Sequence, residues 1–178
     1  NGKHWLKKFL GNVVSLSPEA EVYLVDNAST DNSVNYVQRN HTSVKIIKNL
    51  ENKGYAGGYN QALSNICSDY YILLNSDVEV TKNWIPPIIK LMEEDEKIAA
   101  CQPKIKSFHQ KSKFEYAGAC GGFIDYLGYP FCRGRIFETL EKDEQQYNNS
   151  LEIFWATGAC LFIRAKSFHE VGGLDSNF

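Results

Sequence analysis

The feature that most constrains the fold is an alternation of short apolar runs with segments of helical periodicity. Runs rich in Val, Ile, Leu and Tyr are typical of buried strands, and three of them occupy residues 21–25, 44–47 and 70–74. Helical periodicity and capping residues predict helices over residues 3–15, 31–40, 54–67 and 82–95. Strands and helices in this alternation form right-handed βαβ units. The sequence therefore predicts an α/β domain with a mostly parallel sheet between helices.

The pattern changes after residue 97. The regular elements predicted there are a strand over 98–105, a strand over 153–163 and a helix over 165–171. Residues 114–135 combine glycines with aromatic residues, which predicts irregular structure with close backbone packing. Residues 138–150 are polar and are expected to form a mobile surface segment. We expect one domain, 1–178, with two halves over 1–97 and 98–178.

Composition excludes several classes of protein. Lys and Arg total 19 against 21 Asp and Glu, so the chain lacks the basic excess of a dedicated nucleic-acid binder. No apolar run approaches the roughly 18 residues of a membrane span, and nothing resembles a signal peptide. The five cysteines are widely spaced without a C-x-x-C pair, which argues against a zinc site or a disulfide framework. We therefore expect a reducing, cytoplasmic environment.

Polar residues follow two of the predicted strands. Asp26 ends the first strand, and Asn75, Ser76 and Asp77 follow the third. In parallel sheets, ligands bind beyond the carboxyl ends of the strands. In an extended segment Asn75 and Asp77 point the same way, so both side chains are able to face one ligand.

A carboxylate at such a site suggests a metal-bound nucleotide. Carboxylate and diphosphate repel each other unless a divalent cation lies between them, and Mg²⁺ or Mn²⁺ completes its shell with phosphate oxygens and water. Asp77 is then the metal ligand, and Asp26 accepts a hydrogen bond from a base or ribose. The alternative is that both acids only form turns and caps. Thr30 or Asp31 is expected to cap the helix over 31–40.

The segment Gly54–Asn60 contains three glycines at a predicted helix start. Such a start attracts anions and lets a ligand approach the backbone. The spacing matches neither a dinucleotide fingerprint nor a P-loop, and close helix–strand packing explains the glycines equally well.

Five segments, in order, resemble the successive motifs of family 2 glycosyltransferases, in particular the rhamnosyltransferase-like branch. They are Val25–Asp31 (V-D-N-A-S-T-D), Asn52–Asn60 (N-K-G-Y-A-G-G-Y-N), Leu74–Asp77 (L-N-S-D), Trp155–Cys160 (W-A-T-G-A-C) and Gly172–Asp175 (G-G-L-D). Each motif is weak alone, but five in register over nearly the whole chain are specific.

The resemblance implies a Rossmann-like GT-A fold, truncated here at both ends, and an inverting, metal-dependent transfer from a nucleotide-diphosphate sugar. The donor would be a UDP-, dTDP- or GDP-sugar with Mg²⁺ or Mn²⁺. The acceptor would be a saccharide or a lipid-linked saccharide, as in polysaccharide biosynthesis. Residues 1–97 would form the nucleotide-binding half and residues 98–178 the acceptor-side half. If the acceptor is lipid-linked, the expected cytoplasmic protein would work as a peripheral protein at the inner face of the membrane. The oligomeric state stays open.

The resemblance also assigns residues. Asp77 would be the metal-binding last acid of the D-x-D motif, with Asn75 in place of the first acid. Asp31 would cap its helix and not contact the donor. The implied donor contacts are Asp26, Asn27, Ser29, Lys53, Gly54, Asn75 and Ser76. The implied acceptor-side residues are Trp155, Thr157 and Gly158, although Trp155 fits a core position equally well.

Two expected parts of the family pattern are not found in the chain. The family's first strand is expected before Asn1, and the general base in an acidic segment after Phe178. The catalytic residue is therefore unknown, with Asp175 a weak candidate. Two other functions remain open: a sugar-phosphate nucleotidyltransferase, and a truncated domain that binds nucleotide without turnover.

Overall fold

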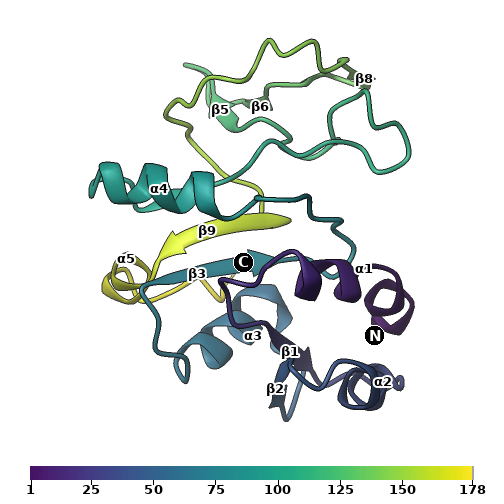
Figure 1. Cartoon of the computed structure of the whole chain (residues 1–178). Coiled ribbons are helices and arrows are strands. Elements are labelled where there is room, and N and C mark those ends of the chain that lie inside the picture. The colour runs from purple at the N-terminus through teal and green to yellow at the C-terminus, as the bar shows by residue number, and fades with distance from the viewer. Residues whose placement is uncertain (178) are drawn as a thin grey trace. The chain divides into compact units, whose positions relative to one another are not determined.

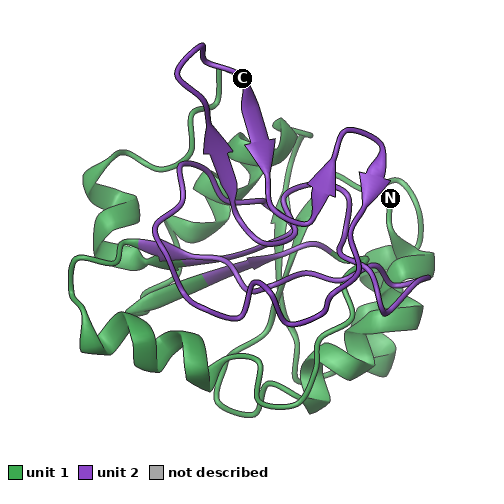
Figure 2. Ribbon diagram, turned by 90° about the horizontal axis from the view of Figure 1, so that it is seen from above, with its two compact units in different colours: residues 1–71, 76–99, 163–178 green, residues 72–75, 100–162 purple. Residues whose placement is uncertain are grey.

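The computed structural model describes residues 1–177 (Figure 1). The chain divides into two compact units, coloured in Figure 2. Unit 1 comprises residues 1–71, 76–99 and 163–178, and unit 2 comprises residues 72–75 and 100–162. The chain passes between the units within two of its strands, so each unit is built from separate stretches of sequence.

Unit 1 contains most of the regular structure. Its helices are α1 (Lys3–Ser15), α2 (Ser33–Asn40), α3 (Gly54–Leu63), α4 (Pro86–Glu94) and α5 (Ala165–Glu170). Strands β1 (Tyr23–Asn27) and β2 (Lys45–Asn49) pair in parallel, with Tyr23 opposite Lys45 and Asn27 opposite Asn49. This parallel pairing confirms the βαβ arrangement predicted for the first strands, with α2 as the crossover helix.

The third predicted strand joins a different sheet. Strand β3 (Tyr70–Leu74) lies in a three-stranded sheet of order β3-β9-β4, with β9 (Cys160–Arg164) in the middle and β4 (Ala100–Cys101) at the other edge. Hydrogen bonds beside the strands join Asn75 N to Ala159 O (3.0 Å) and Ala165 N to Asp69 O (2.9 Å). Rising residue numbers therefore meet falling ones, so β9 runs antiparallel to β3, as the arrows in Figure 1 also show. The β1–β2 pair is thus parallel, whereas β3 lies in a sheet that contains an antiparallel neighbour.

Unit 2 is more regular than the sequence predicted. Strands β5 (Gly122–Ile124) and β6 (Pro130–Cys132) form an antiparallel hairpin, and β7 (Arg135–Ile136) and β8 (Thr139–Leu140) form another. The first hairpin lies within residues 114–135, which were expected to be irregular. The second overlaps residues 138–150, which were expected to be mobile. Their strands are only two or three residues long, too short for the alternating pattern that identifies strands from sequence.

Two strand predictions in the second half were too long. The strand expected over 98–105 is reduced to β4, and the one expected over 153–163 begins only at Cys160. Side-chain contacts explain the first case, because Gln102 bonds across to the backbone at Gly118 and Thr157 where a longer strand would continue. Ion pairs from the Asp143 carboxylate to Lys104 (2.9 Å) and Lys106 (3.0 Å) tie residues 138–150 into unit 2.

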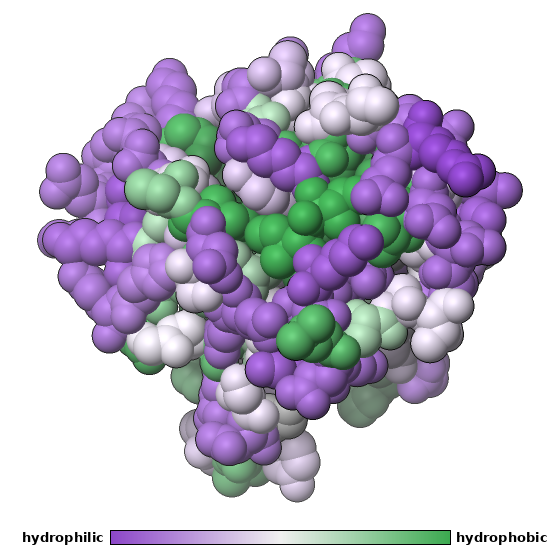
Figure 3. Space-filling model, turned by 90° about the horizontal axis from the view of Figure 1, so that it is seen from below, coloured by the Kyte–Doolittle hydropathy of each residue, from purple (hydrophilic) through white to green (hydrophobic). Residues whose placement is uncertain are grey.

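The apolar core of unit 1 lies between α1, α2 and the β1–β2 pair. Leu6 and Leu10 recur four residues apart on one face of α1 and are buried with Val37 and Val44. Burial of each such side chain contributes roughly 1.5–3 kcal/mol. The face of the molecule in Figure 3 is mostly polar around a central group of apolar side chains. Within residues 1–177, no helix has both the length and the hydropathy to cross a bilayer.

One carboxylate serves the starts of two helices. Asp31 accepts hydrogen bonds from the backbone N–H of Lys3 (3.1 Å), the first residue of α1, and of Ser33 (2.9 Å), the first residue of α2. It also accepts from the Ser33 hydroxyl. These bonds, chiefly the one from the Ser33 hydroxyl, lower the pKa of Asp31 from 3.8 to about 2. The capping role expected for Asp31 is thus present, and it extends to α1.

Substitution Asp31→Ala is expected to lower the free energy of unfolding by about 1 kcal/mol near neutral pH, because two helix starts lose an acceptor. Since the folded-state pKa of about 2 lies below the usual 3.8, the contribution is complete above 3.8 and disappears as the pH falls towards 2. Urea unfolding at about pH 6 and about pH 2.5 measures this difference.

Glu19→Ala, which removes an exposed carboxylate beyond the end of α1, is the matched control and is expected to change stability by less than about 0.5 kcal/mol. An Asp31→Ala effect of equal size at both pH values would contradict the assignment.

Candidate functional site

The carboxyl end of β1 carries a buried acid. Asp26 is 8% exposed, and its Oδ2 accepts a single long hydrogen bond from the Ser29 backbone N–H (3.4 Å). An ionised carboxylate accepts several hydrogen bonds, so Asp26 retains capacity for a further donor. The carboxyl end of β1 therefore presents an acceptor where a ligand of the strand ends would lie.

The next residue, Asn27, is the centre of a hydrogen-bond network at the strand ends. Its Nδ2 donates to Asn52 Oδ1 (2.8 Å) and to Gly54 O (2.8 Å). Its Oδ1 accepts from Asn49 Nδ2 (3.1 Å) and from the Lys53 backbone N–H (3.2 Å). These four bonds use the full capacity of a primary amide. The predicted donor contact of Asn27 is thus occupied within the protein.

Asn49 and Gly58 complete this network from β2 and α3. Asn49, at the end of β2, is 4% exposed, and its Nδ2 also reaches Gly58 O (3.4 Å). A Cβ at Gly58 would lie 3.0 Å from Asn27 Nδ2, which is closer than ordinary van der Waals contact. The glycine therefore lets α3 pack directly on Asn27. Sequence reasoning missed Asn49, although a polar residue at a buried strand end was a usable signal.

The start of α3 is held by a hydrogen bond from its first backbone N–H, and Lys53, the residue before it, lies at the surface. Gly54 donates its N–H to Asn52 Oδ1 (3.0 Å). Lys53 Nζ lies 3.7 Å from Glu51 Oε1, with both side chains well exposed. An exposed ion pair of this length costs little to break, so the Lys53 ammonium is able to exchange Glu51 for an anionic ligand.

The segment after β3 is exposed. Asn75, Ser76 and Asp77 are all exposed, and Ser76 Oγ would lie 3.5 Å from a Cβ at Gly2, beside the start of α1. Among residues 1–177 no three or more His, Cys, Asp or Glu residues are grouped to hold a metal ion. A single exposed carboxylate fits a cation that takes most of its ligands from diphosphate oxygens and water.

The predicted acceptor-side residues lie in unit 2. Trp155 Nε1 donates to Phe123 O (3.2 Å), and a Cβ at Gly122 would lie 1.9 Å from Trp155 Cε2. The ring therefore packs on the glycine backbone. Thr157 is 9% exposed, and its N–H donates to Gln102 Oε1 (2.8 Å), whose amide also donates to Gly118 O (2.6 Å). Sequence reasoning missed Gln102, because no pattern marked a residue that bridges two distant backbone segments.

Asp175 is used by its own turn. Its Oδ1 accepts a hydrogen bond from the Asn177 backbone N–H (2.8 Å), and the residue is exposed in the loop after α5. The Asp175 carboxylate therefore has a structural role as the hydrogen-bond acceptor of this turn.

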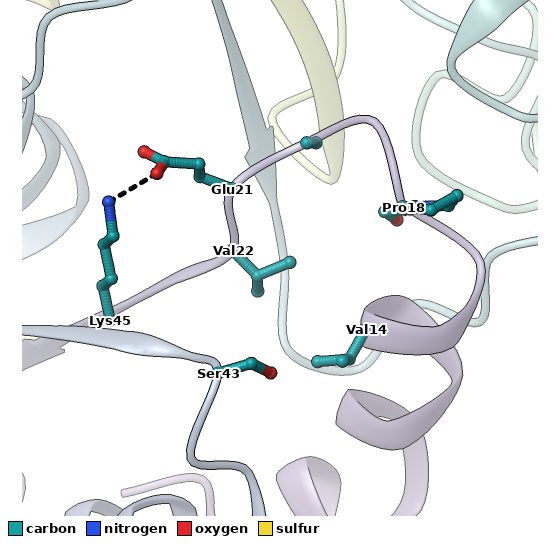
Figure 4. Close-up of a pocket in the computed structure, with 8 residues that line it drawn as sticks. Val14, Pro18, Glu21, Val22, Ser43 and Lys45 are labelled. Carbon is teal, nitrogen blue, oxygen red and sulfur yellow. Dashed lines mark hydrogen bonds and ion pairs between the residues drawn. The ribbon is translucent and has the colours of Figure 1, made fainter.

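A pocket of about 270 Å³ lies at the opposite end of the β1–β2 pair (Figure 4). It is lined by Val14, Pro18, Val22 and Ser43 beside an ion pair between Glu21 Oε1 and Lys45 Nζ (2.5 Å). That ion pair lowers the pKa of Glu21. Glu21 and Lys45 lie at the amino ends of the strands, so this pocket is not part of the site marked by Asp26.

Comparisons with known proteins agree with the fold. The family model for glycosyl transferase family 2 matches residues 1–172. The N-acetylglucosaminyl-diphospho-decaprenol L-rhamnosyltransferase of Mycobacterium tuberculosis is 25% identical over 194 residues, covering 99% of this chain and 62% of the relative. The chain thus spans less than two thirds of that relative.

Two solved structures share the architecture at 16% identity. One is the mannosyltransferase PcManGT from Pyrobaculum calidifontis in complex with GDP-Man and Mn²⁺, with a TM-score of 0.64 over 99% of this chain and 45% of that one. The other is GalNAc-T7 with UDP, GalNAc and Mn²⁺, with a TM-score of 0.67 over 96% of this chain and 34% of that one. These similarities confirm the α/β GT-A fold predicted from the sequence.

Substitution Asn27→Ala is expected to lower the free energy of unfolding by about 2 kcal/mol, because it leaves the Asn49 amide and the Lys53 N–H without their acceptor. Urea unfolding measures the change. Asn35→Ala, which removes one exposed 3.5 Å bond in α2, is the control. A loss below about 0.5 kcal/mol for Asn27→Ala would show that the network contributes little to stability.

Proposed function

The chain belongs to glycosyl transferase family 2, and on this basis we propose that its protein is an inverting, metal-dependent glycosyltransferase. It moves a sugar from a nucleotide-diphosphate sugar to a saccharide or lipid-linked saccharide. The observation that carries the proposal is the pair of acids in unit 1, Asp26 at the end of β1 and Asp77 after β3, inside motifs in the family's order.

The comparisons support the substrate class. The relative from M. tuberculosis is named for a lipid-linked acceptor, and both structural neighbours were solved with nucleotides and Mn²⁺. We infer a UDP-, dTDP- or GDP-sugar as donor. A lipid-linked acceptor also supports a cytoplasmic protein that works at the inner face of the membrane.

On the donor side, Asp77 holds Mg²⁺ or Mn²⁺ together with the diphosphate, and Asn75 and Ser76 line the same turn. When bound, the cation offsets charge on the departing diphosphate. Asp26 accepts a hydrogen bond from the base or ribose, and Ser29 lies in the same turn. The exposed Lys53 ammonium and the Gly54 backbone lie at the start of α3, an end that favours anions.

The amide network changes the role proposed for Asn27. Because all four of its hydrogen bonds are made inside the protein, Asn27 acts by holding Lys53 and Gly54 against the end of β1. It is thus a positioning residue, and the donor contacts come from its neighbours.

On the acceptor side, Trp155, Thr157 and Gly158 of unit 2 contact the acceptor sugar, and Gln102 holds the Thr157 backbone. An inverting displacement also needs a carboxylate to deprotonate the acceptor hydroxyl. Asp175 is a poor candidate because its carboxylate caps a turn. The base is therefore sought in the acidic segment that the family pattern has after Phe178.

Substitution Asp77→Asn is expected to remove most Mn²⁺-dependent nucleotide binding, because it deletes the charge that opposes the cation. Calorimetry with UDP or GDP, with and without Mn²⁺, measures the effect. Asp69→Asn, at the exposed amino end of β3, is the matched control and should bind like wild type. Unchanged Mn²⁺-dependent binding by Asp77→Asn would refute the metal assignment.

The full-length protein is expected to release the nucleoside diphosphate (UDP, dTDP or GDP) from the corresponding nucleotide sugar when acceptor and Mn²⁺ are present. Formation of pyrophosphate from a nucleoside triphosphate and a sugar 1-phosphate would instead identify a nucleotidyltransferase. Nucleotide binding without product from either substrate pair would identify a domain without turnover.

A further inference from the structure

Asn60 joins two segments of unit 1 that are far apart in sequence. It lies on α3, and its side-chain amide pairs with the backbone of Leu174 in the loop after α5. Nδ2 donates to Leu174 O (2.7 Å), and Leu174 N–H donates to Oδ1 (2.9 Å). Nδ2 also reaches Ser176 Oγ (3.3 Å). The Asn60 amide therefore pairs with both backbone groups of Leu174, as a neighbouring strand would.

The loop is shaped to accept this amide. Gly173 has φ +85°, in the left-handed region, and a Cβ there would lie 2.5 Å from Asn60 Oδ1. A side chain at this position would both strain the backbone and displace the amide. The Gly173 N–H donates to Phe168 O (2.8 Å), which ends α5 and sets the direction of the loop.

The base of the loop is also held. Phe168 is buried against Tyr71, with ring centroids 5.7 Å apart, and the Tyr71 hydroxyl lies 2.9 Å from His169 Nε2. The same hydroxyl donates to Ile66 O (2.7 Å), just after α3. Helix α5 is thus fixed near the end of α3, and Asn60 fixes the loop that follows it.

From Asn60 the loop continues towards the start of α3. Ser176 Oγ would lie 3.9 Å from a Cβ at Gly57, one helical turn before Asn60. The next residues in that direction are Gly54 and Lys53, which Asn27 ties to the end of β1. The loop residues that follow Leu174 therefore lie nearer to the proposed donor site than Leu174 itself does at Asn60.

We propose that Asn60 is a positioning residue that anchors residues 173–176 on α3, on the side of the helix whose start lies at the proposed donor site. This inference rests on the proposed function. Asn60 itself does not touch the donor, so its loss should slow the chemical step and leave donor binding nearly unchanged.

Amide hydrogen exchange of the full-length protein tests the anchor without any substrate. In Asn60→Ala the Leu174 N–H loses its acceptor and is expected to exchange at least about tenfold faster, whereas amides of β1 keep their rates. Asn65→Ala, which removes an amide bond to Gln61 O (2.9 Å) at the end of the same helix, is the matched control. Unchanged exchange at Leu174 in Asn60→Ala would overturn the anchor.

Steady-state kinetics of the same variants test the positioning role. Asn60→Ala is expected to lower kcat for sugar transfer by about 10²-fold, with the donor KM and the Kd for UDP or GDP with Mn²⁺ within about twofold of wild type. A normal kcat, or a loss confined to KM, would overturn the role. If Asn60→Ala does not fold, Gly173→Ala tests the same point, because its Cβ displaces the loop and keeps Asn60.

The two proposals fail in different ways. A wild-type protein that neither binds nucleotide with Mn²⁺ nor consumes any nucleotide sugar overturns the proposed function, and with it the positioning role. An active wild type with an equally active Asn60→Ala overturns only the inference about Asn60.

Discussion

The donor half of the candidate site depends on one side-chain amide. Asn27 makes four hydrogen bonds that join the ends of β1 and β2 to the turn before α3. One partner, Asn49, is buried, and its amide would be costly to leave unpaired. The network therefore specifies where the neighbouring groups stand: Asp26 on one side, and Lys53 and Gly54 on the other. An amide with all four of its hydrogen bonds made inside the protein thus orders the residues proposed to bind the donor.

Helix α3 is hydrogen-bonded to two other parts of unit 1, the strand ends and the loop after α5. Its start is tied to the strand ends through Asn27, and its middle holds the loop after α5 through Asn60. Gly58 and Gly173 make both contacts possible, because any side chain would separate the packed surfaces. Within the segment 54–60, Gly58 therefore serves close packing, which is one of the two explanations that the sequence left equal.

Much of unit 1 followed from local patterns. The helix over 3–15 and the strand over 70–74 agree with α1 and β3, and the other first-half elements differ mainly at their ends. Hydrophobic periodicity succeeds there because each element buries one continuous face. Unit 2 has strands of two or three residues, held by contacts such as Trp155 on Gly122 and Asp143 between two lysines. Contacts between residues that distant leave no periodic trace in the sequence.

By itself, the sequence determined the α/β class, the family and the order of the motifs, because residue types at strand ends and helix starts reflect local backbone geometry. Only the tertiary structure decided how those residues are used. It places the Asn27 amide in four hydrogen bonds inside the protein, brings the Asp31 carboxylate to the starts of two helices, and joins Asn60 to Leu174 across 114 residues. The physical reason is that a side-chain hydrogen bond is specified by distance and direction in space, which the fold creates and the order of residues does not encode.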